Sequence, residues 1–412
     1  MVENSTTLKK IINCIYYRAI NFLKPYKRIA WYTEKSCDIL IFDDEGSDIL
    51  LNCIPAKSSF FIIKNRVEIP LFVSLSFFVN LFFNVIEYRK PRIAIIRALI
   101  KHLKPKVIIT YIDNSLAICK IKKLFPLIPL IAVQNGTRFD FSVKNRDRME
   151  YDYYFSFGSV EADIFKQGGH TVSNFFPIGS LRAGIYLNEF FAEHKEKEFD
   201  LCYISQFDPI PHNSSEVDKW TYEMIASYHE VGKRYFYLIA KFAEENKLSL
   251  CVAMRYPKNS ANFANENEYY SFLGQAKVEY IPQNGFSSYQ AVQASRVCFT
   301  ISSTLGYEAL GWGERVIFAK DSKEVNSLVM QGAWTDNLVT HRLPQLQRLY
   351  SLDYSELSFK ATELLKMTNE KYMTYSKNAR KYYMNFDNKK KPHEIIKSKI
   401  AQFIPRGDRC DA

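Results

Sequence analysis

Short runs of apolar, often β-branched residues alternate along most of the chain with longer segments whose apolar residues recur every three or four positions. The first pattern predicts buried strands, and the second predicts helices packed on a sheet. The alternation therefore predicts an α/β fold of doubly wound parallel sheets. The expected strands are Arg28–Thr33, Asp38–Phe42, Ser58–Lys64, Val107–Ile112, Leu130–Val133, Tyr153–Phe157, Asp200–Ser205, Ser249–Met254, Val278–Ile281, Val297–Ile301 and Arg315–Ala319.

The strand pattern pauses near residues 189–198, a charged and strand-poor stretch that is the best candidate for a domain boundary. We expect an N-terminal α/β domain over residues 1–193, a second over 194–385 and a basic C-terminal tail over 386–412. Two similar domains of this kind would place a ligand site in the cleft between them.

Two segments raise the question of membrane contact. Ile69–Ile86 carries no charge, yet Ser76, Asn80 and Asn84 recur every four residues and would share one face of a helix. That stripe favours a buried helix over a membrane span, with contact to a membrane surface as the alternative. The basic opening Asn4–Lys27 can lie on an anionic membrane or simply pack on the domain.

The composition is that of a globular protein, with 47% hydrophobic and 24% charged residues. The net charge of +11 suits nucleic acid, anionic lipid or a phosphorylated or carboxylated small molecule, but a generally lysine-rich surface explains it equally well. The eight cysteines form no C-x-x-C pair, so we expect reduced thiols in a cytoplasmic protein. The polar start of the chain shows no signal peptide.

Several motifs are missing. The sequence has no P-loop, no G-x-G-x-x-G after a first strand, no H-E-x-x-H and no G-x-S-x-G. It also lacks a D-x-D cation site, although Asp43 and Glu45 come close to one. We therefore expect no metal and no tightly bound cofactor.

The most informative stretch is the turn after Val297–Ile301. Ser302, Ser303 and Thr304 stand where the strand ends and a helix begins. The first N–H groups of a helix are unpaired and its dipole is positive there, so the turn is a ready phosphate site. Glu308, one turn further in, can accept hydrogen bonds from a ribose. An ordinary capped helix is the alternative.

Charged residues follow two other strands of the same half. Arg255 can pair with a phosphate or carboxylate, or make a surface salt bridge. Asp208 can serve as nucleophile or base, or cap the turn before Pro209. His212 is the one histidine near these turns, with a surface or core role as its alternative.

These residues carry a resemblance. Ile301–Leu310 resembles the nucleotide-binding turn of two-domain GT-B glycosyltransferases, whose domains are Rossmann-like. The N-terminal half is similar to bacterial surface-carbohydrate biosynthesis proteins of lipopolysaccharide and capsule loci. The pieces that match are Leu40-I-F-D-D-E-G-S, Tyr111-I-D-N-S, Val133-Q-N-G-T-R and Phe176-P-I-G-S-L-R.

Within GT-B enzymes, the resemblance extends to those that use CMP-activated acidic sugars, the sialyl- and Kdo-transferases. It implies that Ser302, Ser303 and Thr304 bind the CMP phosphate and that Glu308 binds the ribose. Arg255-Tyr256-Pro257 stands where the sialyltransferases carry His-Pro, so the retaining β-Kdo transferases fit better. Such enzymes rely on a carboxylate nucleophile, for which Asp208 is the candidate.

The turns of the first half would then bind the acceptor. Gln134, Asn135 and Arg138, together with Asp113, offer groups that bind hydroxyls of an acceptor or donor sugar, as does His212. Asp44 is the alternative catalytic base if the reaction inverts. Asp113 is a further catalytic candidate.

The leading hypothesis is a metal-independent transferase that moves Kdo from CMP to a growing surface glycan such as lipopolysaccharide, O-antigen or capsule. It would work in the cytoplasm at the inner face of the membrane, touch the membrane through its basic ends and bind no nucleic acid. The alternatives are a transferase that uses a UDP- or GDP-sugar or a CDP-polyol, and a non-catalytic glycan- or lipid-binding assembly protein.

Overall fold

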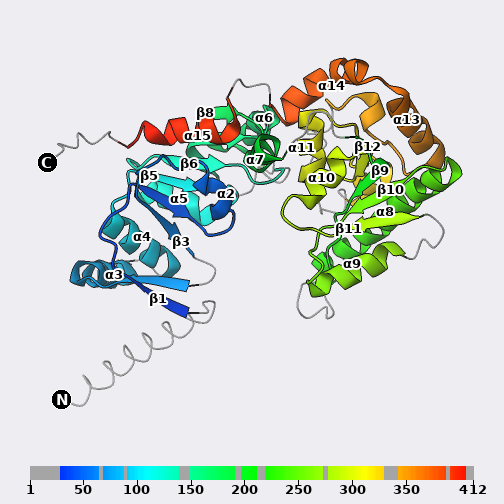
Figure 1. The fold of residues 1–412 in the computed structure, drawn as a ribbon. Helices are drawn as coiled ribbons and strands as arrows, with labels where there is room; N and C mark the ends of the chain where they lie inside the picture. The colour runs from blue at the N-terminus through cyan, green and yellow to red at the C-terminus, as the bar shows by residue number, and fades with distance from the viewer. Residues whose placement is uncertain are drawn as a thin grey trace, which may run out of the picture.

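The computed structural model describes residues 28–64, 68–87, 91–138, 148–190, 196–210, 219–271, 277–328, 342–386 and 390–404. Two parallel sheets, each covered by helices on both faces, lie side by side along the long axis of the molecule (Figure 1). This arrangement confirms the predicted α/β fold. Six cysteines in the described segments are buried free thiols, as the lack of pairing motifs predicts.

The first domain contains a six-stranded parallel sheet in the order β3-β2-β5-β6-β7-β8. Its strands are β2 (Ile39–Phe42), β3 (Phe60–Ile63), β5 (Val107–Thr110), β6 (Leu130–Val133), β7 (Glu150–Ser156) and β8 (Thr171–Pro177). The helices between them are α2 (Ser47–Leu51), α4 (Pro91–Leu103), α5 (Leu116–Leu124), α6 (Val160–Gly168) and α7 (Leu181–Glu189).

Alternation along these central strands explains why helices cover both faces. Leu40 and Ile108 pack with Leu99 of α4 on one face. The residues between them, such as Ile39, pack with α2 and α7 on the other. Both sets are fully buried, which is why the strands read as continuous apolar runs.

The prediction that Ile69–Ile86 forms one buried helix is wrong. Its start is strand β4 (Glu68–Phe72), which pairs with β1 (Arg28–Tyr32) in a separate two-stranded parallel sheet. The helix α3 begins only at Leu75 and ends at Glu87, and it packs against α4. No helix in the described ranges is long and apolar enough to cross a membrane.

The second domain contains a five-stranded parallel sheet in the order β11-β10-β9-β12-β13. Its strands are β9 (Phe199–Ile204), β10 (Leu250–Ala253), β11 (Val278–Ile281), β12 (Ser295–Thr300) and β13 (Val316–Phe318). Its helices are α8 (Lys219–Glu245), α9 (Ala261–Ser271), α10 (Ser287–Gln293), α11 (Thr304–Trp312), α12 (Lys323–Leu328), the short 3₁₀ helix η4 (Gln345–Gln347), α13 (Tyr354–Lys366) and α14 (Asn369–Tyr383). The order 3-2-1-4-5 within this domain is that of a Rossmann-like half.

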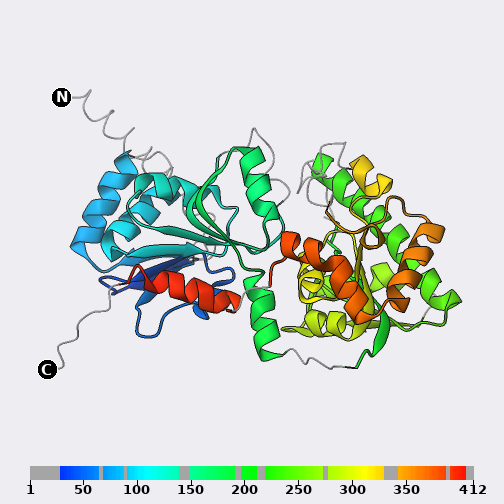
Figure 2. The ribbon, with the colours of Figure 1, turned by 90° about the horizontal axis from the view of Figure 1, so that it is seen from above.

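The chain after α14 returns to the first domain. Residues 386–412 were expected to be a basic tail, but Pro392–Ala401 forms helix α15, which lies along the first sheet (Figure 2). Ile396 and Ile400 are fully buried there against Val107 and Ile185. At the end of α14, Asn385 donates a hydrogen bond from its backbone N–H to Phe157 of the first domain at 2.8 Å. The segment after α14 therefore ties the second domain to the first.

Candidate functional site

A cavity of about 360 Å³ opens at the carboxyl ends of β9, β10 and β12. This is the edge at which open α/β sheets bind ligands. It brings together the five residues predicted to handle donor and phosphate, Asp208, Arg255, Ser302, Ser303 and Thr304, with contributions from both domains. The complete lining is Thr137, Ser205, Gln206, Asp208, Ile225, Tyr228, His229, Arg255, Ser302, Ser303 and Thr304.

The strand-to-helix turn forms one wall of this cavity. Ser303 takes the N-cap position of α11, but its side chain makes no capping hydrogen bond. The turn is held instead by the Ser302 N–H, which donates to Gln206 Oε1 at 2.8 Å, and by the Ser303 N–H, which donates to Thr300 Oγ1 at 3.1 Å. Ser302 and Ser303 therefore line the cavity at the positive end of the α11 dipole.

Arg255 and Asp208 form an ion pair across the cavity. Arg255 Nη1 lies 2.5 Å from Asp208 Oδ1 and also donates to the Phe207 carbonyl at 3.1 Å. Both side chains are about half exposed, at 46% and 54%. The pair therefore places one cation and one carboxylate beside the turn Ser302–Thr304, and both side chains remain accessible to a ligand.

Glu266 of α9 fixes the turn that carries Arg255. Its buried carboxylate accepts hydrogen bonds from the backbone N–H groups of Arg255 at 2.9 Å and Tyr256 at 3.1 Å. It also accepts a hydrogen bond from the Ser205 hydroxyl. Burial raises the pKa of Glu266, although these donors oppose the rise. The residue ties the turns after β9 and β10 to each other.

His229 of α8 is the histidine that the structure brings to the cavity. Its Nε2 lies 2.5 Å from the Asp208 carbonyl oxygen, which can only accept, so the ring carries its proton on Nε2. Burial lowers the pKa of His229 and favours this neutral form. His212, the histidine expected from the sequence, lies outside the described residues.

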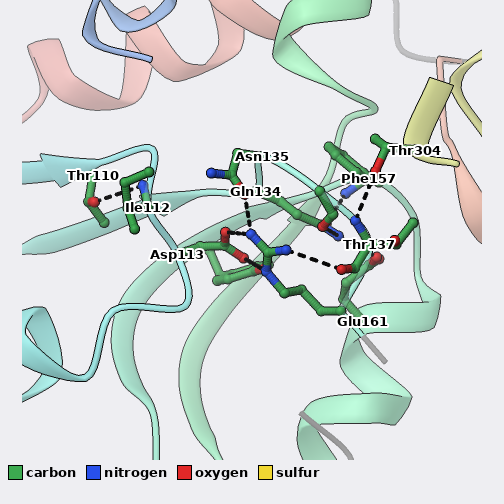
Figure 3. Close-up of polar contacts among 12 residues, drawn as sticks. Thr110, Ile112, Asp113, Gln134, Asn135, Thr137, Phe157, Glu161 and Thr304 are labelled. Carbon is green, nitrogen blue, oxygen red and sulfur yellow. Dashed lines mark hydrogen bonds and ion pairs between the residues drawn. The ribbon is translucent and has the colours of Figure 1, made fainter. Parts of the chain in front are cut away.

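In the first domain, the predicted site residues form a buried network (Figure 3). Arg138 Nε donates to Asp113 Oδ2 at 2.9 Å, and a second Arg138 nitrogen bonds the other oxygen. Tyr154 donates to the same carboxylate at 2.5 Å, and Asn135 accepts a bond from Arg138. Asp113 is completely buried. Its prediction as a further catalytic residue is therefore not supported, because the carboxylate is paired and closed to substrate.

The side chain of Gln134 is also buried and hydrogen-bonded inside the domain. Its Nε2 donates to Gly136 O at 2.9 Å and Glu161 at 2.7 Å, while its Oε1 accepts from the Phe157 N–H. The prediction that this amide binds sugar hydroxyls is wrong, because every polar atom of the side chain already has a protein partner. The network instead holds the loop between Gln134 and Arg138, from which Thr137 reaches the cavity.

Thr137 links this loop directly to the turn at the start of α11. Its N–H donates to Thr304 Oγ1 at 3.3 Å (Figure 3). The contact joins a first-domain loop to the start of α11 across the mouth of the cavity. A ligand phosphate bound at α11 would therefore lie next to the first domain.

Glu308 and Asp44 do not line the cavity. Glu308 is buried in the domain interface, where it accepts hydrogen bonds from Ser180 and, at 2.7 Å, from Tyr289. Its carboxylate joins the two domains, which corrects the expected contact with ribose. Asp44 lies in the turn between β2 and α2, beside Asp43, whose φ of 82° is unusual for a residue other than glycine.

Glu161 gives a pH-dependent prediction. Burial raises its pKa to about 7. Between the unfolded value of 4.5 and this folded value, the folded protein holds a proton that the unfolded chain has lost, so stability falls as pH rises. We expect the contribution of Glu161 to the free energy of unfolding to fall by about 3 kcal/mol across this window. Urea denaturation of the wild type and Glu161→Gln at pH values on either side of the window measures it; parallel pH dependences of the two proteins would contradict the assignment.

The described residues contain no group of three or more His, Cys, Asp and Glu side chains placed to hold a metal ion. That the reaction needs no metal remains a prediction.

Fold and site together define a two-domain protein of the GT-B class, with a polar cavity at the sheet edge of the second domain. A family described as "putative O-antigen biosynthesis protein" matches residues 131–336, half of the chain. The chain belongs to this family. The matched region contains the Gln134–Arg138 loop and all of the cavity lining.

Three solved structures to which the chain is similar are the following. A "putative UDP-N-acetylglucosamine 2-epimerase" from Listeria monocytogenes matches with a TM-score of 0.50 and 13% identity, over 89% of this chain and 95% of that one. A UDP-GlcNAc 2-epimerase from Methanocaldococcus jannaschii, in complex with UDP-GlcNAc and UDP, matches with a TM-score of 0.49 and 13% identity, over 88% and 99%. Sucrose-phosphate synthase from Thermosynechococcus elongatus matches with a TM-score of 0.44 and 11% identity, over 92% and 97%.

At 13% identity, the likeness to the Listeria monocytogenes structure shows the shared architecture alone. No functionally curated protein matches the sequence.

Proposed function

We propose that this protein is a glycosyltransferase of surface-glycan assembly that binds the phosphate of a nucleotide-sugar at the N-terminus of α11. The observation that carries the proposal is the cavity at that helix end, where Arg255 and Asp208 lie beside Ser302, Ser303 and Thr304. Membership of an O-antigen biosynthesis family supports a role in glycan assembly.

The donor we propose is CMP-linked Kdo, an acidic sugar with a carboxylate next to its anomeric carbon. Its phosphate and its carboxylate are two anions close together, and the cavity offers two positive features, the dipole of α11 and the Arg255 guanidinium. Fixed groups of this kind stabilise the charge that collects on the leaving phosphate without rearranging during the reaction.

Asp208 is the proposed nucleophile. Its carboxylate would form a bond to the anomeric carbon as the bond from that carbon to the CMP phosphate oxygen breaks. An acceptor hydroxyl then displaces Asp208 and passes its proton to the bound CMP. Arg255 pairs with this carboxylate, and His229 holds the backbone carbonyl of the same residue.

The acceptor would approach from the first domain. Thr137 already touches the start of α11 through Thr304, so a glycan held by the first domain would reach the sugar next to this contact. The buried pair of Asp113 and Arg138 serves in this scheme to hold the Thr137 loop in place. Asp44 remains the proposed base for an inverting reaction.

A thermal-shift panel of CMP, CDP, UDP and GDP tests the donor class. A ligand that binds only the folded state raises the melting temperature by mass action, so we expect a clear rise with CMP and little with the others. A rise with UDP or GDP alone would replace CMP-Kdo with a neutral-sugar donor, and a rise with CDP alone would favour a CDP-polyol. No response to any nucleotide would overturn the transferase proposal and leave a glycan- or lipid-binding protein.

A further inference from the structure

The exposed face of α3 carries large hydrophobic side chains. Six of them are between 40% and 82% exposed: Leu75, Phe78, Val79, Phe82, Phe83 and Val85. Trp31 of β1, which is 60% exposed, extends this surface and contacts Phe78, with ring centroids 6.2 Å apart. A monomeric soluble protein seldom exposes so much contiguous apolar surface without a partner for it.

The polar residues of α3 run from the edge of this surface to the buried face: Ser76 is exposed, Asn80 is half-buried and Asn84 is buried. Asn84 is buried and donates to the Asn80 carbonyl at 2.7 Å, and Asn80 donates to the Ser76 carbonyl at 2.9 Å. The side-chain amides of Asn80 and Asn84 therefore donate hydrogen bonds to carbonyl groups of the preceding turn of the same helix. Phe77 is buried together with Asn84, so α3 packs on the domain through a narrow face and leaves most of its large apolar side chains exposed.

Cationic residues lie along the edge of this surface. A cavity of about 500 Å³ borders α3 and is lined by Ser74, Ser76 and Asn80 on one side and by Lys35, Lys101 and Lys104 on the other. The three lysines are exposed, and Glu34 is the one carboxylate in the lining. Positive charge beside exposed aromatic rings is what a protein presents to an anionic lipid surface.

We propose that α3 and the adjoining Trp31 form a docking surface for an anionic bilayer, with the apolar side chains in the interfacial layer and Lys35, Lys101 and Lys104 against lipid headgroups. The charge at its edge favours a bilayer over a second copy of this chain, because two copies meeting at this face would bring like charges together. The surface lies at the end of the first domain away from the second (Figure 1), so docking leaves the donor cavity accessible. The inference does not depend on the identity of the donor.

Co-sedimentation of the full-length protein with vesicles tests this surface. We expect binding to phosphatidylcholine vesicles that contain phosphatidylglycerol, and weaker binding to phosphatidylcholine alone. The double variant Phe82→Ser with Phe83→Ser should lower the partition coefficient by about tenfold or more, because it removes two aromatic rings from the interface. The matched control, Tyr237→Ser with Phe359→Ser, removes two similarly exposed rings from the second domain and should bind like the wild type.

A second variant distinguishes the contribution of the lysines to vesicle binding from that of the aromatic rings. Lys101→Gln with Lys104→Gln should lower binding to anionic vesicles and leave the weak binding to neutral ones unchanged, whereas Lys371→Gln with Lys377→Gln on α14 should change neither. Thermal melts should show all variants folded, since exposed substitutions alter stability little.

Unchanged vesicle binding by the Phe82 and Phe83 variant, or absent binding by the wild type, overturns the proposal. A wild-type dimer that this variant converts to a monomer in light scattering overturns it too, because a second copy would then be the occupant. Loss of binding on Lys9→Gln with Lys10→Gln, with the α3 variants unaffected, would assign the contact to the N-terminal segment instead.

Discussion

Asp208→Asn is expected to lower turnover by about 10³-fold or more while the protein still binds its nucleotide. The amide keeps the size of the side chain but cannot form the proposed bond to the anomeric carbon. It also removes a negative charge that lies 2.5 Å from Arg255, leaving that guanidinium to the phosphate. Nucleotide affinity should therefore be unchanged or slightly tighter. The rate of product formation under saturating donor measures turnover, and calorimetric titration with nucleotide measures affinity.

A loss of turnover without a loss of nucleotide affinity would identify Asp208 as a residue of the chemical step. Glu268→Gln is a matched control, since it makes the same chemical change on an exposed carboxylate of α9 outside the cavity lining. It should leave both values unchanged. Wild-type turnover in Asp208→Asn would remove the residue from the chemistry, and a loss of nucleotide binding equal to the loss of turnover would make it a binding residue.

Arg255→Gln is expected to weaken nucleotide binding by about 2 kcal/mol, or about 30-fold, because it removes a charge-assisted hydrogen bond to phosphate. The variant keeps the backbone N–H that donates to Glu266, so the turn after β10 should hold its shape. Calorimetric titration of the variant with the nucleotide that stabilises the wild type measures the change.

Arg296→Gln provides the control for charge and exposure. Arg296 also pairs with an aspartate of β9, Asp200, at 2.8 Å, and it is 41% exposed compared with 46% for Arg255. It stands at the start of β12, the opposite end of the sheet from the cavity. Equal losses of affinity in the two variants would show a general effect of net charge and contradict a phosphate contact at Arg255.

The parallel sheets could be predicted because their signals are local. The central strands β2, β5, β6 and β10 are short apolar runs buried at every position. The edge strand β8, which is exposed or half-buried throughout, has no such run and is absent from the expected strands. The phosphate turn followed from the same logic, since Ser302 to Thr304 stand directly between β12 and α11. The carboxyl ends of parallel strands meet at one edge, so the sequence alone places Asp208 and Arg255 beside that turn.

The residues that position the site could not be predicted in this way. Gln206 bonds Ser302 across 96 positions of the sequence, and Glu266 bonds the Ser205 hydroxyl across 61. Nothing near either residue indicates these partners. His229 was missed for a related reason, because it comes from the middle of a 27-residue helix and not from a turn.

Two errors have one physical origin. Polar residues at strand ends predict ligand contacts, but Asp113 and Gln134 are buried and satisfied by Arg138, Glu161 and their neighbours. The lack of charge in Ile69–Ile86 favours a buried helix, but α3 buries Phe77 and leaves most of its large apolar side chains exposed. Residue type indicates what a side chain can bind, whereas its partner depends on packing that a single sequence does not display.

The most direct test of the central claim is a crystal structure of the protein with the nucleotide that raises its melting temperature. We expect the phosphate next to the donor sugar to lie at the N-terminus of α11, about 3 Å from backbone N–H groups of its first turn and from the Arg255 guanidinium. A nucleotide bound with its phosphate elsewhere, for example at the Asp44 turn of the first domain, would contradict the account.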